Sequence, residues 1–219
     1  MKITACRFHV SATRPEEFPR DDRPQIAFMG RSNVGKSSLL NRLLGVRGLA
    51  RSSKEPGRTR AINFFLVNER VYFVDLPGYG YARVPDAVRE QWKEMVEGYV
   101  TGPGRPDLAL QLLDARREAS DMDGELRDWL ADRGVRHEIV LTKLDKLSRN
   151  EKPRALAGAA RWIGLKDRTL PIAVSAATGE GMAALWRVID EVCENTASRA
   201  SRGDGPRARA ATQGGSITP

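Results

Sequence analysis

The chain has 219 residues, 41% of them apolar, and a formal net charge of +8 at pH 7. This length and composition favour one α/β domain with an appended tail. The apolar runs are short and broken by charges, so the sequence predicts no membrane-spanning helix, and the charged first 25 residues argue against a secretory signal. The two cysteines, Cys6 and Cys193, are not spaced as a metal site, which favours reduced thiols in a cytoplasmic protein.

Two segments hold most of the excess positive charge. Residues 47–60 contain five Lys or Arg side chains and one Glu, and residues 196–219 contain four Arg and one Asp. Two local basic segments, in a chain that is otherwise nearly neutral, suggest two places that contact polyanions. For residues 196–219, a simply solvated run of charges is an equally good interpretation.

Strands and helices alternate along residues 24–195, after an N-terminal arm at residues 1–23 that we expect to lie extended on the domain. In chain order, we expect a strand at 24–30, a helix at 37–45, strands at 61–67 and 70–76 joined as a hairpin through Asn68 and Glu69, a helix at 86–100, a strand at 107–115, a helix at 122–134, a strand at 136–143, a helix at 150–164, a strand at 169–176 and a helix at 181–194. This order predicts a three-layer α/β fold, in which helices cover both faces of a six-stranded, mostly parallel sheet with one antiparallel strand. The composition of residues 196–219 predicts a disordered tail.

The segment GRSNVGKS at 30–37 matches Gly-x-x-x-x-Gly-Lys-Ser, the phosphate-binding P-loop, and lies between an expected strand and an expected helix. Glycines let the backbone approach phosphate oxygens, which the N–H groups of the helix N-terminus attract. Lys36 can reach the β- and γ-phosphates, and the Ser37 hydroxyl can ligate Mg²⁺. The predicted phosphate-binding residues are Gly30, Arg31, Ser32, Asn33, Val34, Gly35, Lys36, Ser37 and Ser38.

Three later segments at expected strand ends indicate the nucleotide. In DLPG, Asp75 can hold Mg²⁺ through water and the Gly78 N–H can meet the γ-phosphate. In TKLD, Asp145 can accept hydrogen bonds from N1–H and the 2-amino group of guanine, which adenine lacks. Lys143 can lie along the base, and the VSA backbone can meet the guanine O6, which argues against a P-loop ATPase or kinase. The predicted GTP contacts here are Asp75, Leu76, Pro77, Gly78, Thr142, Lys143, Leu144, Asp145, Val174, Ser175 and Ala176.

Thr142 departs from the commoner Asn-Lys-x-Asp pattern. The asparagine normally buttresses the loop, and a threonine hydroxyl can do part of this. We therefore expect somewhat weaker or altered guanine binding rather than its loss.

The basic loop before residue 61 is expected to supply the nucleotide-dependent switch. The predicted GTP contacts in this loop are Gly57, Arg58 and Thr59. Thr59 can reach Mg²⁺ with its hydroxyl and the γ-phosphate with its N–H. The alternatives are Ser52 or Ser53, or a threonine that binds no ligand.

Together, GRSNVGKSSLLN, PGRTRAINFF, FVDLPGYGYA, LTKLDK and VSA resemble the EngB/YsxC/YihA family of bacterial ribosome-biogenesis GTPases, within the TrmE-Era-EngA-EngB-Septin-like P-loop GTPases. The resemblance covers about residues 20–195, and DLPGYGYA with PGRTR is its most specific part. It implies a Mg²⁺-dependent GTPase G domain that helps to assemble the large ribosomal subunit and is needed for normal septation in cell division.

Hydrolysis is expected to be slow. Ras-type enzymes carry a glutamine after D-x-x-G that orients the attacking water, and here Tyr79, a phenol on a mobile loop, takes that position. The expected catalytic residues are Lys36, Thr59 and Gly78, acting through positioning and electrostatics, with a partner such as the pre-ribosomal particle accelerating the reaction.

Asn33 suggests a second cofactor. The pattern G-x-x-N-x-G-K-S resembles the P-loops of potassium-activated GTPases, which implies that Asn33 holds K⁺ near the phosphates. The alternative is an asparagine that only hydrogen-bonds its own loop.

The expected partners are GTP or GDP and the large ribosomal subunit or its precursor. Residues 47–60 adjoin the switch, so we expect them to bind rRNA most strongly in the GTP state, with residues 196–219 as a further contact. No heptad pattern is present, which favours a monomer. The alternatives are a nucleic-acid-binding module with a structural nucleotide site, and a GTPase that acts mainly at the division septum.

Overall fold

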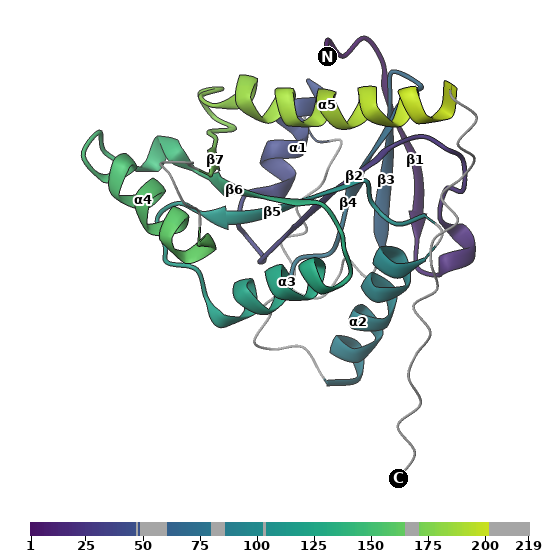
Figure 1. The fold of residues 1–219 in the computed structure, drawn as a ribbon, viewed down its shortest axis with the longest axis horizontal. Helices are drawn as coiled ribbons and strands as arrows, with labels where there is room; N and C mark the ends of the chain where they lie inside the picture. Colours follow the sequence, from purple (N-terminus) through teal and green to yellow (C-terminus); the bar gives the residue numbers. More distant parts are fainter. Residues whose placement is uncertain (47, 49–60, 80–85, 103, 165–170, 202–219) are drawn as a thin grey trace.

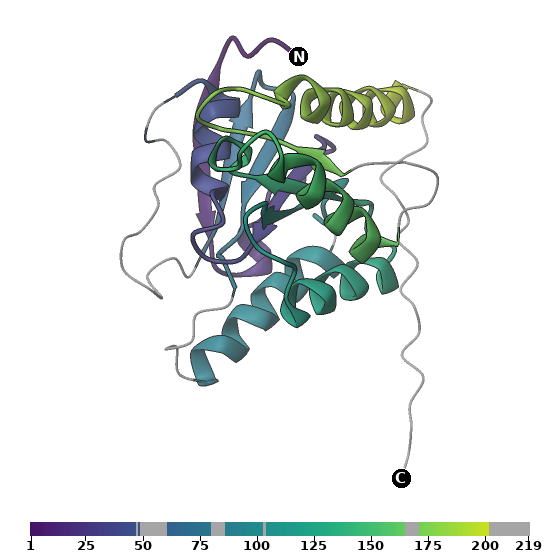
Figure 2. The same cartoon turned by 90° about the vertical axis from the view of Figure 1, so that its left-hand side faces the viewer.

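The computed structural model describes residues 1–46, 48, 61–79, 86–102, 104–164 and 171–201, and its core is a seven-stranded sheet between two layers of helices (Figures 1 and 2). The strands are β1 (Cys6–Ala12), β2 (Gln25–Gly30), β3 (Ile62–Val67), β4 (Val71–Asp75), β5 (Leu108–Asp114), β6 (His137–Thr142) and β7 (Ile172–Ala173). The helices are α1 (Lys36–Leu44), α2 (Asp86–Thr101), α3 (Asp121–Asp132), α4 (Glu151–Ile163) and α5 (Met182–Ser201), with short 3₁₀ turns η1 (Pro15–Glu17) and η2 (Leu144–Lys146).

The sheet has the order β1-β3-β4-β2-β5-β6-β7. Among the described strands only β3 runs against the others, because it pairs antiparallel with both β1 and β4 while the remaining pairs are parallel. The α/β class and the single antiparallel strand are therefore confirmed. The hairpin between β3 and β4 turns through Asn68 and Glu69, whose φ angles of 51° and 52° are those of a type I′ turn.

The predicted count of six strands is wrong, because the segment expected to be an arm contributes β1 to the sheet. This strand pairs with β3 from Cys6 opposite Val67 to Ala12 opposite Ile62, with an irregularity between Phe8 and Val10. An edge strand has one neighbour and is mostly exposed here, so its sequence lacks the continuous apolar run that marks a central strand such as β2.

Alternating strand residues divide the core between the two faces of the sheet. Leu108 and Leu110 of β5 face the cluster under α1 and α5, whereas Ala109 faces the cluster under α2 and α3. Helix α4 packs on a third cluster that includes Leu113 of β5. Because each fully buried leucine contributes roughly 1.5–3 kcal/mol, these layers hold the strand ends in place.

Two predicted boundaries need correction. Strand β7 has only two residues within the expected strand 169–176, and residues 165–170 lie outside the described part of the chain. Helix α5 continues to Ser201, into the segment 196–219 predicted to be disordered, because the sequence after Glu194 still contains helix-compatible residues. Residues 202–219 lie outside the described part. Among the described residues, none of the helices combines the length and apolarity needed to span a bilayer.

Candidate nucleotide-binding site

The predicted motifs meet at one edge of the sheet. Strands β2, β4, β6 and β7 are linked by parallel pairing through β5, so their carboxyl ends face the same way. The P-loop follows β2, DLPG follows β4, TKLD follows β6, and VSA begins directly after β7. In open α/β sheets this edge is where ligands bind, so the topology brings together the described parts of the predicted site.

The P-loop has a backbone suited to anions. Asn33 and Gly35 have φ angles of 62° and 109°, in the left-handed region that favours glycine and tolerates asparagine. Helix α1 begins at Lys36, and its N-cap, Gly35, makes no side-chain capping bond. The N–H groups of the first turn are therefore not satisfied by a cap, which is the usual arrangement of a phosphate-binding helix N-terminus.

Lys36 forms an ion pair with Asp75, and both side chains are largely buried, with 12% and 6% of their surfaces exposed. The lysine comes from the P-loop and the aspartate from the end of β4. Removing one member of a buried ion pair leaves the other uncompensated. Lys36 can therefore leave Asp75 at low cost only if another charge replaces it there.

The oxygen donors at this end fit Mg²⁺. Ser37 lies in the first turn of α1, and Asp75 is the buried carboxylate beside Lys36. Among the described residues no group of three His, Cys, Asp or Glu side chains could cage a metal. Mg²⁺ is usually bound by one or two protein oxygens together with substrate phosphates, so this sparse donor set suits it.

The loop after β4 is docked on the P-loop. The Ser32 N–H donates to the Tyr79 carbonyl at 3.0 Å, and the Tyr79 N–H donates to the Gly30 carbonyl at 3.3 Å. A Cβ added at Gly78 would lie 3.1 Å from the Ser32 backbone, so a larger residue would push the two loops apart. The DLPG loop and the P-loop thus form one packed unit.

Tyr79, which we expect on a mobile loop, is buried in the structure. The side chain is 8% exposed, and its hydroxyl donates to Asp123 Oδ1 at 2.7 Å. Burial, and then this hydrogen bond, raise the pKa of the phenol far above its ordinary value. Tyr79 therefore anchors the loop as a neutral, buried side chain, and its hydroxyl is not placed to orient or deprotonate a water molecule.

Asp123 was not among the predicted site residues. Its other oxygen accepts hydrogen bonds from the Ser120 N–H and hydroxyl at 2.8 and 2.7 Å, which caps α3. Gln111 of β5 donates to the Asp123 carbonyl at 2.7 Å. The spacing of Ser120 and Asp123 is a capping signal that could have located this helix start, but nothing in it indicates the contact with Tyr79.

At the opposite end of the site, TKLD and VSA are joined to each other. The Ser175 hydroxyl donates to Asp145 Oδ1 at 2.7 Å, and the Leu144 N–H donates to the Val174 carbonyl at 3.2 Å. The hydrogen bond from Ser175 lowers the pKa of Asp145. The Lys146 ammonium also lies 3.4 Å from Asp145 Oδ2. The carboxylate proposed to read guanine is therefore held ionised by the Ser175 hydroxyl and, more weakly, by the exposed Lys146.

Thr142 links TKLD to the P-loop. Its hydroxyl lies 2.6 Å from the Val34 carbonyl and 3.0 Å from the Leu113 carbonyl, and can donate its one proton to either. The side chain is only 3% exposed. The threonine hydroxyl thus provides a buttress between the loop, β5 and the P-loop.

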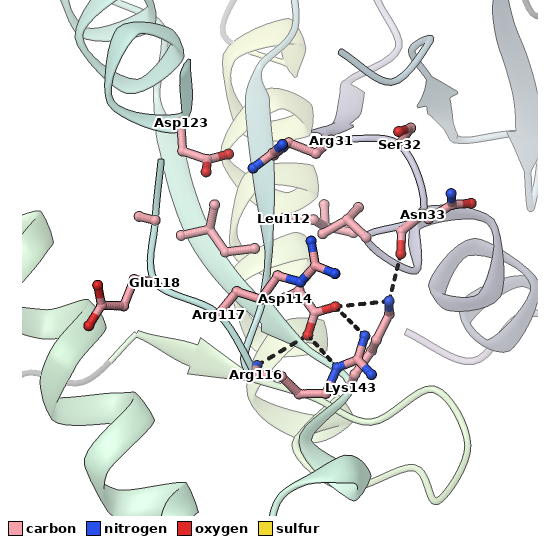
Figure 3. A pocket seen from close by; sticks show the side chains of 13 residues that line it. Arg31, Ser32, Asn33, Leu112, Asp114, Arg116, Arg117, Glu118, Asp123 and Lys143 are labelled. Atoms are coloured by element: carbon pink, nitrogen blue, oxygen red, sulfur yellow. Dashed lines mark hydrogen bonds and ion pairs between the residues drawn. The ribbon is translucent and has the colours of Figure 1, made fainter. Parts of the chain in front are cut away.

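Lys143 makes a second link between the same loops. Its φ angle is 60°, and its ammonium donates to the Asn33 carbonyl at 2.6 Å and to Asp114 at 2.9 Å. Figure 3 shows the Asn33 carbonyl directed at Lys143 while the Asn33 side-chain amide points away from it. Gly57, Arg58 and Thr59, with the alternatives Ser52 and Ser53, lie outside the described residues.

A P-loop after β2, a D-x-x-G loop after β4 and a T-K-x-D loop after β6, all at one edge of the sheet, are the motifs of the class of P-loop GTPase domains. A family model described as a 50S ribosome-binding GTPase matches residues 25–143. A probable GTP-binding protein EngB of Syntrophus aciditrophicus is 46% identical over 192 residues, covering 88% of this chain and 95% of that protein. One from Solibacter usitatus is 44% identical over 189 residues, covering 86% of this chain and 96% of that protein. The chain belongs to the EngB family of GTP-binding proteins and is a GTPase.

Solved structures agree on the fold. The crystal structure of a probable GTP-binding protein engB superposes with a TM-score of 0.60 at 24% identity, covering 78% of this chain and 99% of that one. A point variant of Era from Aquifex aeolicus, bound to GDP and AlF₄⁻, superposes with a TM-score of 0.56 at 22% identity, covering 75% of this chain and 55% of that one. At these identities the matches show a shared G-domain fold.

Proposed function

We propose that this chain is a Mg²⁺-dependent GTP switch that acts in assembly of the large ribosomal subunit and contributes to normal septation. The observation that carries the proposal is the match of residues 25–143, from β2 through Lys143, to a 50S ribosome-binding GTPase family. On this proposal the protein is a cytoplasmic monomer. Its basic segments 47–60 and 196–219 contact rRNA of the subunit or its precursor.

In the proposed mechanism, Lys36 leaves its ion pair with Asp75 and binds the phosphates of GTP. Bound Mg²⁺ would neutralise charge on the phosphates, held by Ser37 and Thr59 and, through water, by Asp75. Lys36 and the Gly78 N–H stabilise charge on the transferred phosphoryl group. Asp145 and the backbone of 174–176 select guanine, and Lys143 lies along the base.

Intrinsic hydrolysis is slow on this proposal because the residue after Gly78 is unavailable. The Tyr79 hydroxyl is already donated to Asp123, and the raised pKa keeps the phenol neutral, so it cannot act as a base. The missing function must come from a partner, and the large subunit is the partner that the family description suggests.

K⁺ bound through the Asn33 side chain is a further part of the proposal. A variant that tests it must tolerate the left-handed backbone conformation of residue 33. The left-handed φ of Asn33 alone would favour Asn or Gly here, so an alanine variant would mix strain with loss of the amide. Asn33→Gly removes the amide and keeps the conformation. GTP turnover in K⁺ and in Na⁺ at equal ionic strength should differ in the wild type and not in this variant.

Sedimentation tests the proposed partner. The protein should migrate with large subunits in GTP, less so in GDP, and dissociate at high salt because phosphate contacts release counterions. Migration independent of the nucleotide would refute gating by GTP. Migration with septal membrane fractions and never with subunits would favour a protein that acts mainly at the division site.

A further inference from the structure

Asp114 lies at the carboxyl end of β5, outside every motif used above. It lines a cavity of about 280 Å³ between the P-loop and the loop after β5 (Figure 3). The other lining residues include Arg31, Asn33, Arg116, Arg117 and Lys143. The cavity thus adjoins the proposed nucleotide site on the side of the P-loop that faces α3.

The Asp114 carboxylate is the centre of a charged cluster. Lys143 donates to Oδ2 at 2.9 Å, and Arg116 donates to both oxygens, at 2.9 and 2.7 Å. The carboxylate is 11% exposed, whereas the side chain of Arg116 is 41% exposed. Burial alone would raise the pKa of Asp114, but the hydrogen bonds from Arg116 and Lys143 outweigh it and hold the pKa well below its ordinary value.

Lys143 connects this charged cluster to the P-loop. Its ammonium donates to both Asp114 and the Asn33 carbonyl, which fixes the end of a long side chain that otherwise has several rotatable bonds. A Cβ added at Gly35 would lie 3.6 Å from the Lys143 Cε, so the stem packs along the P-loop. Because its ammonium is held at two points, the Lys143 side chain is pre-organised for a ligand that packs against its stem.

We propose that Asp114 is a positioning residue for guanine-nucleotide binding, which acts by holding Lys143 against the P-loop. The inference rests on the proposed assignment of Lys143 to the nucleotide site. Asp114 need not touch the nucleotide. Loss of its charge should free the Lys143 ammonium, weaken binding, and leave the chemistry at the phosphate end unchanged.

Arg116 provides the matched control. It shares the Asp114 carboxylate with Lys143, but its side chain is more exposed and its hydrogen bonds go to Asp114 rather than to the P-loop. Arg116→Ala removes one charge from the cluster and keeps the contact between Asp114 and Lys143. It should change GDP affinity by less than about twofold, as for an exposed ion pair.

The test is a double-mutant cycle on the full chain, read by titration of fluorescently labelled GDP and GTP. Asp114→Asn should weaken binding of both nucleotides by about tenfold, the size expected when a charge-assisted hydrogen bond is lost. The KM for GTP should rise with little change in kcat. In a Lys143→Ala background, the same substitution should have an effect below about twofold, because coupled residues are not additive.

The outcomes separate this inference from the proposed site. If Lys143→Ala alone leaves nucleotide affinity unchanged, the assignment of Lys143 to the site is wrong. If Lys143→Ala weakens binding but Asp114→Asn does not, or if the two effects simply add, Asp114 has only a structural role and the inference is overturned. Thermal unfolding of each variant checks folding, and Asp114→Ser replaces Asp114→Asn in the cycle if the latter does not fold.

Discussion

Two aspartates, one at each end of the proposed nucleotide site, are held in different ways. Asp75 at the phosphate end is paired with a cation, Lys36, that the mechanism needs elsewhere. Asp145 at the base end accepts from the Ser175 hydroxyl and lies 3.4 Å from the exposed Lys146 ammonium, and the proposed mechanism needs neither of these groups elsewhere. The base end is therefore pre-organised, whereas the phosphate end must exchange partners.

This difference assigns the two ends different tasks. A pre-organised carboxylate gives affinity and base selectivity without rearrangement. An internal ion pair that opens only when phosphates and Mg²⁺ arrive makes the phosphate end respond to the ligand. The docking of Gly78 and Tyr79 on the P-loop adds to this coupling, because movement of either loop disturbs the other.

The largest predicted effect comes from breaking the phosphate end. Lys36→Met should weaken GTP binding by at least about 100-fold and lower the free energy of unfolding by about 3 kcal/mol, because Asp75 is left buried and unpaired. Chemical denaturation and nucleotide titration measure the two effects. Adding Asp75→Asn should restore stability but not GTP binding; restored binding would contradict the proposed role of Lys36.

The next largest effect is expected when Asp145 is changed from a hydrogen-bond acceptor into a group that can also donate. Asp145→Asn should weaken GTP binding by at least about 100-fold. The carboxylate has two charged oxygens for the N1–H and 2-amino donors of guanine, whereas the amide has one neutral oxygen. Its NH₂ group can instead donate to the 2-oxo group of xanthine, so XTP binding should improve. Competition of GTP and XTP against labelled GDP measures the change, and equal losses for both would argue against a contact with the base.

Ser175→Ala tests pre-organisation itself. Without its hydrogen bond, Asp145 should remain ionised at pH 7 but be less well oriented, so GDP affinity should fall by about tenfold. Because the bond lowers the pKa of Asp145, its benefit is present above the ordinary carboxyl pKa and is lost as pH falls through the lowered value. GDP titrations from pH 6 down to about pH 3, through the ordinary Asp pKa of about 4, should therefore show the variant losing affinity at a higher pH than the wild type. Coincident profiles would mean that Ser175 does not tune Asp145.

Tyr79→Phe is predicted to have the smallest effect on function. Asp123 keeps its capping bonds from Ser120 but its buried Oδ1 loses the hydroxyl donor, so the free energy of unfolding should fall by about 2 kcal/mol. Single-turnover hydrolysis should stay within about twofold of the wild type, because the phenol takes no part in the chemistry. A tenfold loss of rate would show that Tyr79 acts in catalysis.

The sequence was most informative where one local motif carries the chemistry. The P-loop and TKLD each combine a strand end with specific residue types, so their placement could be predicted. Asp114 and Asp123 could not be predicted as site residues, because their partners are 29 and 44 residues distant in the chain. Strand β1 was missed because an edge strand needs little apolar sequence, and Tyr79 because its burial depends on α3.

The most direct test of the account is GTP turnover by the purified protein with and without large ribosomal subunits. The account predicts slow turnover by the protein alone, because Tyr79 cannot orient water, and clear stimulation by the subunits. Lys36→Met, tested alongside, should show no stimulation. Fast turnover by the protein alone, or turnover that large subunits and their precursors leave unchanged, would contradict a ribosome-coupled switch.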